Sequence, residues 1–134
     1  MLEFDVAKIF PFVKQHLPGL AWTDGMVGIG WRHKGELAAG VIYEGLNGKN
    51  VWMRVAAGPG RSWLRRDYLE ACFGYPFTIC GVDRVSGYVN ASNVDACRFD
   101  EHLGFQPEAR LKGAAQDGGD VIIYVMWKQG CRYV

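Results

Sequence analysis

The chain has 134 residues, of which 49% are hydrophobic and 22% charged, which fits one domain over residues 1–134 with a single core. Its formal net charge of +1 excludes an acidic disordered chain and makes nucleic acid an unlikely partner, because a binding face for it is usually strongly basic. No run approaches the roughly 20 apolar residues that span a bilayer and residues 1–5 lack the basic start of a signal peptide, so we expect a cytoplasmic protein with no membrane partner.

A helix is predicted near the N-terminus. Asp5 can cap it, and apolar residues then recur on one helical face as far as Leu17. Pro11 either interrupts this helix or begins a second short one. Pro18 and Gly19 end it.

Three strands are predicted next, over residues 26–31, 36–43 and 51–57. Alternation of apolar and polar residues and the turn residues between them favour this assignment. The first two strands form a hairpin through the short turn at 33–35. A Gly-Pro-Gly break at 58–60 follows the third strand.

Two further helices and three strands complete the chain. An apolar stripe predicts a helix over residues 64–75, which Pro76 kinks or ends. The second helix starts at Asn93 and ends before Gly104.

The last three strands are predicted over residues 84–89, 109–114 and 120–127. Hairpins join most neighbouring strands, and one right-handed strand-helix-strand crossover runs from residue 51 to residue 89. The predicted fold is therefore α+β: a mixed, mostly antiparallel sheet with one parallel splay, covered by helices on both faces in three layers.

The cysteines do not point to a metal site. None of the four lies in a Cys-x-x-Cys pair, and no histidine stands at zinc-finger spacing from them. We therefore expect no metal and four free thiols, at Cys72, Cys80, Cys97 and Cys131.

Four segments carry a resemblance to a known family. Residues 93–105 read Asn-x-x-Ala followed by Leu-Gly-Phe, with Gly-Val-Asp-Arg-Val at 81–85 upstream and Glu-Ala-Arg-Leu at 108–111 downstream. The fourth segment, residues 117–126, follows these three and has the pattern of a final hairpin. Together they resemble the GNAT superfamily of N-acetyltransferases, in the branch of ribosomal-protein N-terminal acetyltransferases and small phage-encoded members, from residue 51 to the end.

The resemblance implies acetyl-CoA as co-substrate. In this superfamily the two parallel strands splay apart, the pantetheine lies in the gap, and the pyrophosphate rests on backbone amides at a helix N-terminus. A primary amine, on a protein N-terminus or a small molecule, then attacks the acetyl group directly. The residues that the resemblance assigns to acetyl-CoA are Val55, Ala56, Ala57, Arg61, Arg65, Arg66, Asn93 and Phe99.

The pyrophosphate loop departs from the family pattern. Its two small positions fall on Trp63 and Arg65, although close approach of backbone to a phosphate favours glycine. Either the arginines at 61, 65 and 66 replace amide contacts by guanidinium–phosphate pairs, or the domain has lost CoA binding and serves as a binding or structural module. A solvated helix face is a competing explanation of these arginines.

The candidate catalytic residues are Asn93, Asp100 and Tyr124. Asp100 occupies the position of the family's tyrosine general acid, and a carboxyl group donates a proton near neutral pH only if its pKa is raised. Tyr124 could reach the amine side or be a core aromatic residue. Glu44 and Glu70 are candidate bases, although surface carboxylates are commoner.

The acceptor side is expected to be open. The helix at 5–17 precedes both early strands, and only a short turn joins residues 31 and 36. An open side would suit a protein terminus or a modified nucleic acid, although the near-neutral charge argues against nucleic acid. The apolar strand at 120–127 either lies at a sheet edge or pairs across a homodimer.

Overall fold

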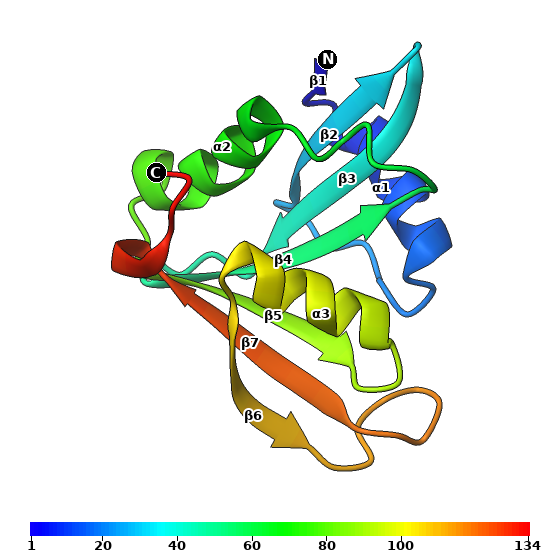
Figure 1. Cartoon of the computed structure of the whole chain (residues 1–134), viewed down its shortest axis with the longest axis vertical. Helices are drawn as coiled ribbons and strands as arrows, with labels where there is room; N and C mark the ends of the chain where they lie inside the picture. The colour runs from blue at the N-terminus through cyan, green and yellow to red at the C-terminus, as the bar shows by residue number, and fades with distance from the viewer.

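The computed structural model describes every residue from Met1 to Val134, and its centre is one seven-stranded sheet in the order β1-β2-β3-β4-β5-β7-β6. Helix α1 covers one face of the sheet, and α2 and α3 cover the other (Figure 1). The predicted α+β class with helices on both faces is confirmed. The strands are β1 (Leu2–Glu3), β2 (Val27–His33), β3 (Glu36–Glu44), β4 (Asn50–Ala57), β5 (Arg84–Asn90), β6 (Gln106–Leu111) and β7 (Val121–Trp127), and the helices are α1 (Val6–His16), α2 (Arg66–Gly74), the π-helical turn η1 (Tyr75–Ile79), α3 (Val94–Leu103) and the 3-10 turn η2 (Lys128–Gly130).

The strands β4 and β5 form the only parallel pair and then separate. They pair at three positions, the last of which joins Trp52 to Ser86. Beyond that point the two strands diverge, as Figure 1 shows. The backbone of β4 from Met53 to Ala57 therefore has no strand partner on its β5 side, which leaves N–H and C=O groups free at the gap. The predicted splay is confirmed.

Helix α1 packs closely on the sheet because glycines lie beneath it. Asp5 caps the helix by accepting a hydrogen bond from the Ala7 N–H at 3.0 Å. A Cβ atom added at Gly40 would lie 2.9 Å from the Val13 side chain, so only glycine permits this approach. The helix runs through Pro11 without a break. Both sequence-based expectations for Pro11 are therefore wrong, because burial of the next turn at Val13 holds the helix together.

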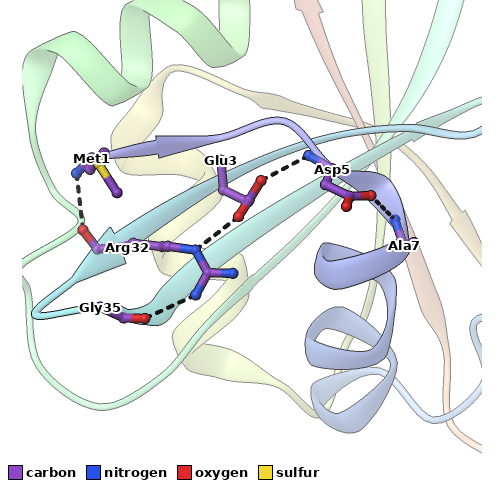
Figure 2. Close-up of polar contacts among 6 residues, drawn as sticks. All are labelled: Met1, Glu3, Asp5, Ala7, Arg32 and Gly35. Atoms are coloured by element: carbon purple, nitrogen blue, oxygen red, sulfur yellow. Dashed lines mark hydrogen bonds and ion pairs between the residues drawn. The ribbon is translucent and has the colours of Figure 1, made fainter.

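The chain begins with a strand that the sequence analysis missed. The Met1 ammonium group donates to the Arg32 carbonyl at 2.9 Å, and the Arg32 Nε donates to Glu3 at 2.9 Å (Figure 2). The second Glu3 oxygen accepts from the Asp5 N–H, and these two hydrogen bonds lower the pKa of Glu3. Helix α1 thus follows the unpredicted strand β1 and, as expected, precedes the two early strands β2 and β3.

Other differences fall where the sequence pattern is weak. The helix α2 passes into the π-helical turn at Tyr75, which contains Pro76. The strand β6 begins three residues earlier than expected, at Gln106, and all its residues are exposed. The strand β7 lies between β5 and β6, so it is not an edge strand. The cap residues of α3 are as predicted, with Asn93 before it and Gly104 after it at φ 116°.

All four cysteines are free. No three metal-ligating side chains come close enough together to hold an ion. None of the helices combines the length and the apolar character needed to cross a membrane.

Candidate functional site

Two pockets meet where β4 and β5 separate. The smaller, of 240 Å³, lies between the two strands and the loops 17–19 and 114–116; we call it the loop pocket. The larger, of 790 Å³, lies between the end of β4, the segment 60–64 and helix α3; we call it the helix pocket.

The two pockets share part of their lining, so ligands in them would lie next to each other. His16 reaches this junction from the last turn of α1, and Asp100 reaches it from α3 on the opposite side of the gap. The remaining shared residues are apolar apart from Asn93. The residues that line both pockets are His16, Leu17, Val55, Asn93, Ala96 and Asp100.

The helix pocket gathers most of the residues that the sequence assigned to acetyl-CoA. Arg65 and Arg66 are not among them. Arg65 pairs with Asp67 at 3.2 Å, and Arg66 pairs with Glu70 at 2.7 Å. Both guanidinium groups are thus engaged elsewhere. The predicted residues that do line the helix pocket are Val55, Ala56, Ala57, Arg61, Asn93 and Phe99.

The segment before α2 offers unpaired backbone amides. The N–H groups of residues 60–63 donate to no acceptor within the protein. The Trp63 side chain is buried at 7% exposure, and its Nε1 donates to the Gly60 carbonyl at 3.2 Å. The indole therefore folds inward beneath the loop. Free amides of this kind favour an anion.

Two arginines of the helix pocket have no partner within the protein. The guanidinium groups of Arg61 and Arg98 line the pocket and make neither a hydrogen bond nor an ion pair. The sequence analysis missed Arg98. Arg98 lies three residues after Asp95 and four before His102, so the three share one face of α3, and all three line the helix pocket. This spacing is the sequence signal that could have located Arg98. Two free guanidinium groups beside free amides fit phosphate groups well.

Asp100 lies at the junction of the two pockets and has an unusual environment. Its carboxylate accepts no hydrogen bond from the protein. Burial, with a smaller contribution from the neighbouring charge of Glu101, raises the pKa of Asp100 to about 7. The carboxyl group is therefore partly protonated at neutral pH, which meets the condition for a proton donor.

Tyr124 lines neither pocket. It is fully buried, and its hydroxyl donates to the Glu101 carboxylate at 2.8 Å. Burial, together with this hydrogen bond, raises the pKa of Tyr124 far above its ordinary value. The contact ties β7 to α3, so the surroundings of Tyr124 indicate a structural role.

The candidate bases from the sequence also lie outside the pockets. Glu70 pairs with Arg66, and Glu44 lies 3.9 Å from Arg54. His16 was missed, although it stands in the last helical turn before a Pro-Gly turn. Its Nδ1 lies 3.0 Å from the Phe12 carbonyl. When Nδ1 carries the proton of this hydrogen bond, Nε2 is left as an acceptor.

Two loops line the loop pocket and lie close to each other, and the open acceptor side stays a prediction. A Cβ atom added at Gly19 would lie 3.6 Å from the Gln116 side chain, so the loop after α1 and the β6–β7 loop approach each other. Ser92 donates to Asp117 at 2.8 Å and holds the second loop near α3. The second of these loops comes from the far end of the chain, so the pattern of the early strands carries no signal of it.

The fold is that of known N-acetyltransferases. Spermidine N-acetyltransferase SpeG of Vibrio cholerae aligns with 100% of this chain and 97% of its own length, with a TM-score of 0.80 and 14% identity. A structure assigned as an acetyltransferase aligns with 96% of this chain and 83% of its own, with a TM-score of 0.74 and 18% identity. No family model and no curated protein sequence matches the chain. The chain has the GNAT fold, and the ribosomal-protein and phage branch stays a prediction.

Proposed function

We propose that this protein transfers the acetyl group of acetyl-CoA to a primary amine by direct attack within a complex of both substrates. One observation carries the proposal. Two pockets enter the same gap between β4 and β5, and they share a titratable residue from each side, His16 and Asp100. Such a junction lets a thioester and an amine meet.

Acetyl-CoA would occupy the helix pocket. The free backbone edge of β4 at residues 55–57 would bind the pantetheine amides, and the unpaired amides of residues 60–63 would bind the phosphates. Arg61 and Arg98 would add charge-assisted hydrogen bonds. Asn93, whose Oδ1 accepts from the Ala96 N–H at 3.2 Å, keeps its amide N–H groups for the co-substrate.

The amine would occupy the loop pocket. Its nitrogen attacks the acetyl carbon, so a carbon–nitrogen bond forms and the carbon–sulfur bond breaks. The proton released from nitrogen passes to Nε2 of His16, and the proton of Asp100 passes to the thiolate sulfur of CoA. Both residues then exchange protons with solvent, which restores the starting state.

The structural neighbours support the chemistry in outline. SpeG is named as a spermidine N-acetyltransferase, and its fold likeness supports acetyl transfer to an amine. One SpeG structure is dodecameric. Self-association of this chain, for example as a homodimer through the exposed edge strand β6, stays part of the proposal, as does a cytoplasmic location.

A calorimetric titration with acetyl-CoA tests the proposal. We expect micromolar binding, weakened about 5- to 10-fold by Arg61→Ala or Arg98→Ala, which is about 1–1.4 kcal/mol each. Arg66→Ala is the matched control, because Arg66 lies outside the helix pocket, and it should leave the affinity unchanged. Binding should be followed by amine-dependent release of free CoA.

Absence of binding at millimolar acetyl-CoA would overturn the proposal. The protein would then be a GNAT-fold binding module, the alternative suggested by Trp63 and Arg65 at the small positions of the loop. Acetylation of a modified nucleic acid, the other alternative from the sequence, would appear as CoA release with that acceptor and not with small amines.

A further inference from the structure

The loop pocket contains a cation whose hydrogen bonds the protein does not supply. Arg54 projects from β4, and its side chain is only 12% exposed. None of its guanidinium N–H groups donates a hydrogen bond within the protein. Its one ion pair, with Glu44, has a nitrogen–oxygen distance of 3.9 Å, too long for a hydrogen bond. The neighbouring Glu44 Oε2 is itself buried without a hydrogen-bond partner, so this ion pair leaves the Arg54 N–H groups available for a further acceptor.

Tyr88 fixes the position of this guanidinium group. The Arg54 Cζ atom lies 4.2 Å from the centre of the Tyr88 ring, which comes from β5 across the gap. Tyr88 lines the same pocket and is 37% exposed. The contact is a cation–π interaction, which holds a guanidinium by its face and leaves its N–H edge for a ligand.

Arg54 is the only arginine or lysine that lines the loop pocket. The other acidic and basic side chains near it are His16 and Asp100, which line the pocket from α1 and α3, and Glu44, which lies 3.9 Å from Arg54. The remaining polar side chains there, Asn90, Asn93, Gln116 and Tyr88, are neutral. A polycation entering the pocket would offer no acceptor to the guanidinium N–H groups, which can only donate. A carboxylate or phosphate would instead provide the bidentate acceptor that guanidinium groups favour.

We infer that the acceptor is a small amine that also carries a carboxylate or phosphate group, and that Arg54 binds this anionic group. The inference rests on the proposed function and names its substrate class. The pocket volume of 240 Å³ fits a small molecule. The acceptor would therefore differ from the polyamine named for the structural neighbours.

Two matched pairs of acceptors test the inference through the rate of CoA release, with the acetylated product identified by mass spectrometry. Phosphoethanolamine is compared with ethanolamine, and glycine with glycinamide, so that the two pairs separate phosphate from carboxylate recognition. Spermidine is the polycationic comparison. We expect the anionic member of at least one pair to have a kcat/KM more than about 10-fold higher than its neutral partner and than spermidine.

Variants assign the preference to Arg54. Arg54→Gln should bring the ratio within that pair close to one without changing the KM for acetyl-CoA, and Arg54→Lys should keep part of the preference. Arg84→Gln is the matched control, because Arg84 stacks on Trp127 but is bound by Glu108 outside the pocket. Thermal melting shows whether each variant is folded. If Arg54→Gln does not fold, the ratio of rates in Arg54→Lys tests the role of Arg54 instead.

The outcomes separate this inference from the proposed function. Equal or better rates with the neutral amines or spermidine, or an unchanged ratio in Arg54→Gln, would overturn the inference while leaving acetyl transfer intact. Ligand-observed NMR with phosphoethanolamine and glycine, without acetyl-CoA, tests it even if no acetyl-CoA binds. Binding of one of these that Arg54→Gln abolishes supports the inference, and binding of neither overturns it.

Discussion

Trp63 and Phe99 meet edge to face beside the helix pocket, with ring centroids 4.9 Å apart and ring planes at 72°. Trp63 comes from the segment before α2, and Phe99 comes from α3. Both line the pocket. The tryptophan that departs from the family's loop pattern thus joins the segment with the free amides to the opposite helix.

We predict that Trp63→Phe weakens acetyl-CoA binding about 3- to 10-fold, or about 0.7–1.4 kcal/mol. The smaller ring loses the hydrogen bond to the Gly60 carbonyl, so the free amides are less well positioned. Calorimetric titration measures the change. Trp22→Phe is the control, because Trp22 is half exposed and packs on Phe10 away from the site. Tighter binding by Trp63→Phe would mean that the indole obstructs the loop.

Asp100→Asn should lower kcat about 10- to 100-fold, because an amide cannot donate the proton that the thiolate takes. The pKa of Asp100, raised to about 7 by burial, predicts that kcat of the unaltered enzyme falls as pH rises through 7. The variant should lose this alkaline decline. An Asp100→Asn enzyme that keeps both the rate and the decline would remove Asp100 from the mechanism.

The same pKa shift predicts how Asp100→Asn changes stability with pH. The folded protein holds the Asp100 proton to about pH 7, whereas the pKa of an aspartate in an unfolded chain is about 3.9. The stability contribution of Asp100 is therefore full below about pH 4 and is lost progressively as pH rises to about 7. Asp100→Asn should raise the melting temperature clearly at about pH 8 and little near pH 4. Thermal melts at both values check the sign.

The sequence predicts the elements that have strong local signals. The helix α3 is placed correctly because Asn93 and Gly104 mark its two ends. The strand β1 was missed because two residues cannot show an alternating pattern. The strand β6 was misplaced because all of its residues are exposed, so no apolar face marks its start.

The sequence likewise predicts only part of the candidate site. Family resemblance located Ala57 and Asn93, which line the helix pocket. The sequence could not locate His16 at the junction or Arg54 in the loop pocket, because their positions depend on the packing of α1 and on the separation of β4 from β5. Contacts between residues so distant in the chain leave no local pattern.

His16→Ala should lower kcat about 10- to 100-fold, because the amine proton loses its acceptor at the junction. The KM for acetyl-CoA should change little, since the lost group acts on the amine. Added imidazole should restore part of the rate. A structural role for His16, for example through its contact with the Phe12 ring, would show no such rescue. His33→Gln is the matched control, since His33 is an exposed residue at the end of β2, outside both pockets.

Tyr124→Phe separates the catalytic role predicted from the sequence from the structural role that its surroundings indicate. The substitution removes the hydrogen bond to Glu101 and keeps the buried ring, so unfolding should become easier by about 0.5–1.5 kcal/mol. Because Tyr124 lines neither pocket, kcat should stay within about twofold of the unaltered enzyme. Chemical denaturation and steady-state rates on the same preparation measure both quantities. A loss of kcat above about 10-fold with unchanged stability would return Tyr124 to the catalytic set.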